Sequence, residues 1–371
     1  MAQEKSVGRV IALEEAFAHP KLLELFPTSY QKMYAMVKDR LSDIGPERIR
    51  RMDAAGIDMQ VLSHVQPGVQ ILKEPDLAIQ VSKEVNDWLS EVVKTYPTRF
   101  AGFAVLPTQS PKDAADELER AVTQLGFKGA LINGHTNGQY LDDESFSVLL
   151  ERAQALDVPI YIHPTDPPQA ISDLYYNGYS STLIQGWGWP VETGTHLLRM
   201  MCAGVFDQYP RLKIIVGHMG ELIPYCLTRL NVSLTVGSWL VAAQEKKAKN
   251  PVTKKGMQKN VRYYMRENVY VTNSGVFDQP VFNCAVSMLG INNLMFSVDD
   301  PFQDNFEAME FLKAADLSPE DKEKFAHGNA ERLLKLLPAT YASGRRQGSF
   351  YAFRAKSKSK IGRALISFLI K

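Results

Sequence analysis

The sequence predicts an α/β protein, and within that class a (β/α)8 TIM barrel, because eight short apolar runs alternate with longer amphipathic stretches. Several of the runs are continuous in Val, Ile, Leu and Phe, as expected for parallel strands that are buried on both faces. The chain of 371 residues also has about the usual length for such a barrel. A doubly wound open sheet is the alternative, but the GxGxxG loop that usually follows its first strand is missing.

The elements are expected in a regular order along the chain. The strands are predicted at residues 9–15, 59–65, 100–106, 129–134, 159–164, 213–219, 269–274 and 294–300. Helices are predicted between them, among others at residues 76–96, 113–126 and 143–157. Two irregular stretches remain. Residues 166–189 are rich in Pro, Gly, Tyr and Trp and predict a long loop at the active-site mouth, and the Lys-rich residues 238–266 predict a surface excursion.

Composition indicates a compact soluble protein. Hydrophobic residues make up 45% of the chain, and 42 Lys plus Arg nearly balance 41 Asp plus Glu. The net charge of +1 argues against a general nucleic-acid binder. Three scattered cysteines are too few for a disulfide framework or a cysteine metal site, so we expect a reducing, cytoplasmic location. The N-terminal residues do not resemble a signal peptide, and no apolar run is long enough to predict a membrane span.

Polar side chains gather at the carboxyl ends of the predicted strands. From the first strand to the eighth they are Glu14 and Glu15, His64, Asn133, His163, His218, and Asp299 with Asp300. Burying such groups without partners costs about several kcal/mol each, so a chance distribution does not explain the pattern. The carboxyl ends of all strands of a barrel meet on one face, where barrel enzymes carry their active sites. The sequence therefore predicts a catalytic site built from these residues.

The residue types at these strand ends are ligands for a hard to borderline metal ion. Carboxylates and imidazoles without a thiolate suit Mn²⁺, Zn²⁺ or Mg²⁺, held with open positions for substrate or water. Glu14, His163 and Asp299 are the natural ligands, and His218 is a candidate fourth. We therefore expect one divalent metal ion in the site.

Two residues that follow His218 extend the predicted site. Glu221 lies three positions later, and on a helix that begins near Met219 it can fix the orientation and charge state of the imidazole. Arg229 lies eight positions beyond Glu221, which is about two helical turns and hence the same helix face. Its guanidinium can there bind a substrate carboxylate through two parallel hydrogen bonds, and a surface ion pair is the alternative.

Four segments resemble the motifs of one known enzyme group. They are IALEEAF (11–17), YIHP (161–164), IIVGHMGELIPY (214–225) and FSVDDPF (296–302). The chain resembles the metal-dependent decarboxylase branch of the amidohydrolase superfamily, in order from about Gly8 to Leu337. This branch includes 2,3-dihydroxybenzoate, γ-resorcylate, salicylate and 5-carboxyvanillate decarboxylases, with aminocarboxymuconate semialdehyde decarboxylase as a relative. The resemblance implies an amidohydrolase-like barrel, a divalent metal, a small aromatic acid as substrate, and a homodimer or homotetramer.

The resemblance also implies roles for single residues. The metal ligands and the pair that assists them are Glu14, His163, Asp299, His218 and Glu221. The positions on the substrate side are Arg229 at the carboxylate, Phe302 at the aromatic ring, and the polar Asn133. Further aromatic residues that can wall the substrate are Trp187, Trp189, Tyr175 and Tyr176, although packing in the core or a loop explains each of them equally simply.

Two positions depart from the pattern of the branch. Ala16 stands two residues after Glu14, where many amidohydrolases have a second histidine, and this favours Mn²⁺ or Mg²⁺ over Zn²⁺. His64 and Gln66 occupy a loop where similar enzymes usually carry smaller or less basic residues. His64 is therefore either specific to the substrate of this protein or a structural histidine bonded to a backbone carbonyl.

The expected activity is that of a carboxy-lyase. We expect metal-dependent, non-oxidative decarboxylation of an ortho-hydroxy aromatic acid of the dihydroxybenzoate, salicylate or orsellinate kind, in which Asp299 protonates a ring carbon before CO₂ leaves. The alternative is a hydrolase or hydratase that acts on a lactone or an unsaturated carboxylic acid. The histidine pair on strand one and the carbamylated lysine on strand four of many hydrolases are absent, which favours the decarboxylase. A non-catalytic barrel is a third alternative, which the intact ligand set disfavours.

The chain is expected to divide into a barrel, residues 1–340, and a basic C-terminal extension, residues 341–371. The extension contains eight cations and no acid, and its apolar residues recur at helical spacing. Such a segment can lie on an anionic membrane surface. Packing against a neighbouring subunit or against the outside of the barrel is the alternative.

Overall fold

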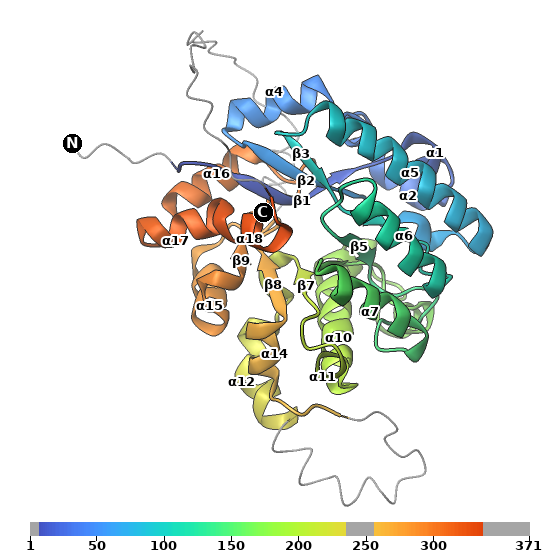
Figure 1. Ribbon diagram of the computed structural model, residues 1–371. Helices are drawn as coiled ribbons and strands as arrows, with labels where there is room; N and C mark the ends of the chain where they lie inside the picture. The colour runs from blue at the N-terminus through green and yellow to red at the C-terminus, as the bar shows by residue number, and fades with distance from the viewer. Residues whose placement is uncertain (1–6, 235–255, 337–371) are drawn as a thin grey trace, which may run out of the picture. The chain divides into compact units, whose positions relative to one another are not determined.

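The fold is a closed barrel of parallel strands surrounded by helices (Figure 1), and the computed structural model describes residues 7–234 and 256–336. The strands in this part of the chain are β1 (Ile11–Phe17), β2 (Met59–His64), β3 (Phe100–Gly102), β4 (Ala104–Val105), β5 (Ala130–Asn133), β6 (Ile160–His163), β7 (Ile214–Val216), β8 (Val269–Thr272) and β9 (Leu294–Met295). All eight predicted strands are confirmed, and the third is written as the two consecutive pieces β3 and β4. The α/β barrel class is confirmed with them.

The sheet order follows the chain order. One sheet has the order β1-β2-β3 and the other runs from β4 to β9, with parallel pairing throughout. A parallel bridge between Leu13 and Ser297 joins the first strand to the segment after β9 and closes the ring. The carboxyl ends of the strands therefore meet at one mouth, as the barrel prediction requires.

The helices of the described residues lie outside the strands in Figure 1. They are α1 (Pro20–Glu24), α2 (Thr28–Tyr34), α3 (Lys38–Ser42), α4 (Pro46–Ala55), α5 (Pro75–Thr95), α6 (Pro111–Thr123), α7 (Ser147–Leu156), α8 (Gln169–Tyr175), α9 (Ser181–Leu183), α10 (Trp189–Cys202), α11 (Val205–Gln208), α12 (Ile223–Val232), α14 (Val261–Glu267), α15 (Gln279–Leu289), α16 (Asn305–Ala314), α17 (Pro319–Glu323) and α18 (Asn329–Leu334). The longest, α5, buries Val81, Val85 and Leu89 at a spacing of four residues, which is why its amphipathic pattern was visible in the sequence.

Two hydrophobic layers hold the barrel together. The inner layer fills the barrel with side chains such as Leu13, Val61, Phe103 and Ile215, and α18 adds Leu333 from one end. The outer layer lies between the strands and the helices. Full burial of one such side chain is worth about 1.5–3 kcal/mol. The packed interior leaves the mouth as the place where polar side chains can gather.

The segment after β7 differs from the prediction. The helix expected near Met219 begins only at Ile223, because Met219, Glu221 and Leu222 all have left-handed φ angles, of 57°, 51° and 67°. Glu221 therefore lies in a tight turn and not on a helix. The prediction that Arg229 shares a helix face with Glu221 is wrong for the same reason.

Two other stretches contain more helix than their composition predicts. Residues 166–189, predicted to be a loop, contain α8, α9 and a further helical turn, η3 (Ile184–Gly188). The predicted surface excursion 238–266 ends in α14, which buries Tyr264 and Met265 in the core. Most of that excursion and the predicted extension 341–371 lie outside the described residues. No helix in the described ranges is long and apolar enough to cross a bilayer.

Candidate active site

Glu14 lies at the centre of the site, in an irregular part of β1. The register between β1 and β2 shifts between Ala12 and Glu15, and Glu14 has a φ of 61°. Such a bulge re-aims a side chain next to many active sites. The carboxylate of Glu14 is 1% exposed. Its Oε2 accepts hydrogen bonds from the hydroxyls of Tyr161 and Thr272, the latter at 3.3 Å, whereas its Oε1 has no hydrogen-bond partner among the described residues.

A glycine makes room for this carboxylate. A Cβ atom placed on Gly217 would lie 2.5 Å from Glu14 Oε2 and 3.1 Å from the Tyr161 hydroxyl. The first distance is shorter than real Cβ contacts, and the second is tighter than most of them. The glycine of the GHMGE segment is therefore required by close approach, and not by its backbone angles.

Two imidazoles face the free oxygen of Glu14. Nε2 of His163 lies 3.4 Å from Glu14 Oε1, and Nε2 of His218 lies 3.8 Å from the same atom. The opposite nitrogens are engaged, because Nδ1 of His163 lies 2.8 Å from the carbonyl oxygen of Pro164 and Nδ1 of His218 lies 2.7 Å from Glu221 Oε1. A proton on Nδ1 of His163 satisfies the carbonyl acceptor and leaves Nε2 of His163 with a lone pair for a metal ion.

Asp299 completes the group from the segment after β9. It is partly buried and has a left-handed φ of 79°. Burial, followed by the Glu14 carboxylate, raises the pKa of Asp299 well above its usual range, and His218 opposes this shift. A raised pKa favours the protonated acid, which is the form that can donate a proton.

Glu221 and His218 form a close ionic pair. Burial alone lowers the pKa of His218, but the carboxylates of Glu221 and Glu14 outweigh it and raise this pKa to about 10. Burial raises the pKa of Glu221, and His218 lowers it. The pKa of His163, in contrast, is lowered by burial, so this histidine is kept neutral. The site thus contains one imidazole that can hold a proton and one that is suited to bind metal.

The donor set fits a divalent metal ion. In residues 7–234 and 256–336, no three His, Cys, Asp or Glu side chains already have their ligating atoms in a closed metal-binding arrangement. The fit rests instead on Oε1 of Glu14, which is buried without a hydrogen-bond partner, and on Nε2 of His163, which faces it. A buried carboxylate oxygen without a hydrogen bond is costly, and a bound cation reduces that cost.

Asn133 lies beside His163. His64 and Asn133 line the same cavity. Asn133 and His163 are register partners on β5 and β6, and Oδ1 of Asn133 is buried without a hydrogen-bond partner among the described residues. Both nitrogens of His64 are used: Nδ1 lies 2.8 Å from the carbonyl oxygen of Val65, and Nε2 accepts the backbone N–H of His19 at 3.1 Å. These contacts are those that the structural interpretation of His64 expects, and a role of His64 in binding substrate stays a prediction.

The aromatic residues divide into two groups. The ring of Phe302 is 43% exposed and lies 6.0 Å from the ring of Tyr34, a buried residue that the sequence analysis missed. Trp189 donates to Asp166 at 2.7 Å, and Tyr176 is buried. Trp187 and Tyr175 are 54% and 60% exposed. Phe302 follows Asp299 by three positions in the chain and donates its backbone N–H to the Asp299 carbonyl, and Tyr34 packs against the Phe302 ring.

Arg229 lies on α12 with an exposed side chain. Among the described residues its side chain forms no hydrogen bond or ion pair, so the surface ion pair that is its alternative explanation is not seen there. Its guanidinium is available to a carboxylate that enters from solvent.

Tyr161 is the most informative residue that the sequence analysis missed as a site residue. It is fully buried in the apolar run of β6, where an aromatic side chain indicates only core packing. We expect Tyr161→Phe to weaken metal binding about tenfold, because Glu14 loses a hydrogen bond that orients it. Tyr264→Phe is the matched control, since it removes a hydroxyl that donates to Asp207 at 2.7 Å. Titration of both metal-free variants with Mn²⁺ makes the comparison, and equal affinities would contradict the role of Tyr161.

Known proteins share this fold and much of this sequence. A family model described as amidohydrolase matches residues 18–336. This chain belongs to the amidohydrolase family. The γ-resorcylate decarboxylase of Polaromonas sp. strain JS666 is 37% identical to this amidohydrolase over 333 residues, which cover 88% of the chain and 98% of the relative. The decarboxylase orsB of Emericella nidulans is 35% identical over 343 residues, which cover 88% and 97%.

A solved structure extends the likeness to three dimensions. The 5-carboxyvanillate decarboxylase of Novosphingobium aromaticivorans, complexed with manganese and 4-hydroxy-3-methoxy-5-nitrobenzoic acid, superposes with a TM-score of 0.79. The two chains are 33% identical, and the match covers 91% of this amidohydrolase and 100% of that chain. The decarboxylase branch named from the four sequence motifs is thereby confirmed.

Proposed function

We propose that this amidohydrolase catalyses the metal-dependent, non-oxidative decarboxylation of an ortho-hydroxy aromatic carboxylic acid. The observation that carries the proposal is the arrangement around Glu14, where a buried, unpartnered oxygen faces two imidazoles. The likeness of this amidohydrolase to three decarboxylases over nearly the whole barrel supports this reaction over the hydrolase or hydratase alternative.

Glu14, His163 and Asp299 would hold the metal ion, with His218 beside it. The ion is proposed to be Mn²⁺, because Glu14 and Ala16 leave β1 without a histidine ligand and because the similar carboxyvanillate enzyme was crystallised with manganese. When bound, the metal supplies a Lewis acid and a template that orients the phenol and carboxylate oxygens of the substrate.

The protein groups would carry the proton chemistry. The carboxylic acid of Asp299 gives its proton to the ring carbon that bears the carboxylate, and that carbon becomes tetrahedral. The bond to the carboxylate then breaks, its electron pair returns to the ring, and CO₂ leaves. Asp299 is left as an anion and regains a proton from solvent. His218 and Glu221 hold a proton beside the substrate oxygens throughout.

Arg229 would orient the substrate carboxylate. A charge-assisted hydrogen bond contributes about 1.5–3 kcal/mol, so we expect Arg229→Met to raise KM at least about tenfold and to change kcat little. Arg211→Met is the control, because it removes another exposed arginine that precedes β7, at the opposite end of the strands. Steady-state kinetics decide the point, and an unchanged KM would remove Arg229 from the substrate site.

Four features expected from the sequence stay predictions. They are the homodimer or homotetramer, the cytoplasmic location, the division at residue 340, and the contact of residues 341–371 with a membrane surface.

A screen of ortho-hydroxybenzoates and orsellinate-type acids, with Mn²⁺ added, tests the proposed reaction. Decarboxylation lowers the mass of the product by one CO₂, whereas hydrolysis or hydration raises it by one water. CO₂ release from at least one acid is the expected result. A gain of water without CO₂ release would favour the alternative.

A further inference from the structure

The seam that closes the barrel is irregular where the site lies. Between β1 and the segment after β9, backbone bonds run from Leu13 N to the carbonyl of Phe296 at 3.2 Å and from Ala16 N to the carbonyl of Asp300 at 2.8 Å. Glu14 lies in the bulge of β1, between Leu13 and Ala16. On the facing segment, Asp299 lies between Phe296 and Asp300 and has a left-handed φ. Each left-handed residue costs about 1–2 kcal/mol, so the surrounding structure has to hold both in place.

The side chain of Glu15 replaces the missing strand contacts. Its Oε1 accepts the backbone N–H of Val298 at 2.9 Å, and its Oε2 accepts the backbone N–H of Asp300 at 3.1 Å. These two amides flank Asp299 on either side. Burial, followed by the Asp300 carboxylate, raises the pKa of Glu15 to about 8, but each oxygen accepts its amide in either protonation state. Glu15 follows Glu14 in the chain, and its carboxyl group thus binds the backbone on both sides of Asp299.

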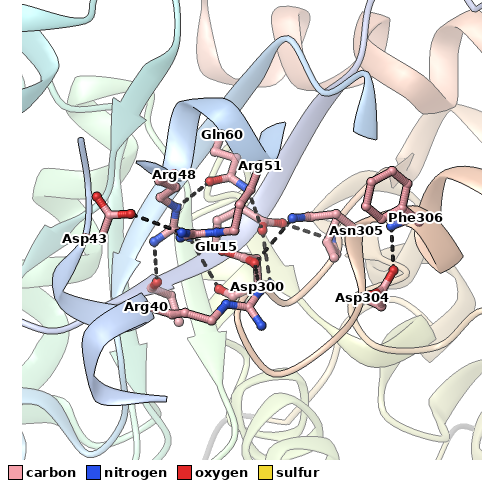
Figure 2. Close-up of polar contacts among 12 residues, drawn as sticks. Glu15, Arg40, Asp43, Arg48, Arg51, Gln60, Asp300, Asp304, Asn305 and Phe306 are labelled. Carbon is pink, nitrogen blue, oxygen red and sulfur yellow. Dashed lines mark hydrogen bonds and ion pairs between the residues drawn. The ribbon is translucent and has the colours of Figure 1, made fainter. Parts of the chain in front are cut away.

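Arg48 connects the same two segments (Figure 2). The fully buried guanidinium donates from Nη1 to the carbonyl of Ala16 at 2.8 Å and from Nε to Gln60 Oε1 at 2.6 Å. Its Nη2 lies 3.2 Å from Asp300 Oδ2, which is an ion-pair distance without the alignment of a hydrogen bond. Arg40 adds a second cation, 2.5 Å from Asp300 Oδ1. The guanidinium of Arg48 therefore bridges residues that follow Glu14 by two and Asp299 by one.

The position of this cluster indicates what it is for. A buried ion pair contributes little net stability compared with apolar side chains of similar volume, so closing the barrel does not by itself require one. The hydrogen bonds of Glu15 and Arg48 end on backbone groups next to Glu14 and Asp299. We propose that Glu15 and Arg48 are positioning residues that set the relative placement of Glu14 and Asp299 and thereby the affinity of the site for metal. This inference rests on the proposed metal site.

The test compares two buried glutamates in the full-length chain. Glu15→Gln keeps the shape of the side chain but turns one acceptor into a donor that faces a backbone N–H. Glu117→Gln is the matched control, because Glu117 is equally buried and accepts from Asn86 at 2.7 Å and from Arg120 at 2.8 Å on helix α6. Metal-free protein is titrated with Mn²⁺ by calorimetry, and the bound ion is observed by electron paramagnetic resonance.

We expect Glu15→Gln to raise the Kd for Mn²⁺ about 10–100-fold and to alter the resonance spectrum of the bound ion. Glu117→Gln is expected to lower the melting temperature about as much as Glu15→Gln does, and to leave the Kd and the spectrum unchanged. Arg48→Lys, which keeps the charge but loses the planar fork of donors, is expected to raise the Kd as well and serves if Glu15→Gln does not fold.

The outcomes separate this inference from the proposed function. If wild-type protein, Glu15→Gln and Glu117→Gln all bind Mn²⁺ equally well with the same spectrum, the positioning role is contradicted and the proposed function stands. If wild-type protein binds no Mn²⁺, the metal-dependent function itself is contradicted. Equal loss of affinity in Glu117→Gln would show a general effect of stability and would also overturn the positioning role.

Discussion

Replacing Asp299 by Asn is expected to lower kcat about 10²–10⁴-fold at saturating metal and substrate, which is the range for loss of a general acid. The amide has nearly the shape of the acid and keeps an oxygen that can face a metal. It has no acidic proton to give to a ring carbon. Burial and the Glu14 carboxylate raise the pKa of Asp299, so the native residue holds that proton more readily than an exposed aspartate does.

The measurement is CO₂ release by protein whose metal content has been determined. Asp321→Asn is the control, because it makes the same chemical change on the exposed helix α17, where Asp321 pairs with Lys324 at 2.9 Å. It should leave kcat unchanged. Normal turnover by a metal-loaded Asp299→Asn protein would contradict the assignment of Asp299 as the proton donor.

Replacing Glu14 by Gln is expected to weaken Mn²⁺ binding by more than the roughly 10–100-fold that loss of a supporting residue causes, because a direct ligand is lost. Activity should fall below detection at metal concentrations that saturate the wild-type protein. Chelation of the wild-type metal should abolish activity in the same way, and added Mn²⁺ should restore it.

The metal-free stability of the same variant separates a metal ligand from a structural residue. Glu14 Oε1 is buried without a hydrogen-bond partner among the described residues, which is a cost of the metal-free protein, but the carboxylate also lies 3.8 Å from His218 Nε2, and the amide loses that attraction. Because these two effects oppose each other, the melting temperature of metal-free Glu14→Gln should stay close to that of metal-free wild type, while the rise caused by Mn²⁺ should disappear. A variant that melts earlier but binds Mn²⁺ normally would show that Glu14 supports the fold and not the metal.

The strands and the strand-end residues were predictable because two simple patterns coincide. Runs such as the one around Ile160–His163 are apolar and end on a polar residue, and in a parallel barrel those ends must meet. The meeting of Glu14, His163 and His218 follows from the fold class alone. Predicting the barrel from the sequence therefore also predicts that these strand-end residues lie close together.

Local backbone conformation was not predictable in the same way. The sequence predicts a helix from near Met219, whereas the observed helix begins only at Ile223. Before it lie four residues other than glycine with left-handed φ angles: His218, Met219, Glu221 and Leu222. Such angles are unfavourable for each residue alone and persist because the packed surroundings impose them. The helical turns α8 and α9 are likewise too short to show a period among the prolines and glycines of residues 166–189.

Long-range partners were also beyond the sequence. Tyr161 has the pattern of a core residue, and only the folded structure shows its hydroxyl donating to Glu14, 147 positions away in the chain. Arg48 and Asp300 are 252 positions apart, and neither has a motif that predicts the other. The sequence does not decide between the two roles of His64, because the contacts of its ring nitrogens with the backbone of His19 and Val65 depend on the fold.

The most direct test of the account follows the reaction in heavy water. Full-length protein loaded with Mn²⁺ is incubated with 2,6-dihydroxybenzoate, orsellinate and related acids in D₂O, and the products are analysed by mass spectrometry and NMR. The account predicts loss of CO₂ and one deuterium at the ring carbon that carried the carboxylate, with no product after chelation. Product formed at the same rate after complete removal of metal, or a product that retains the carboxylate, would contradict it.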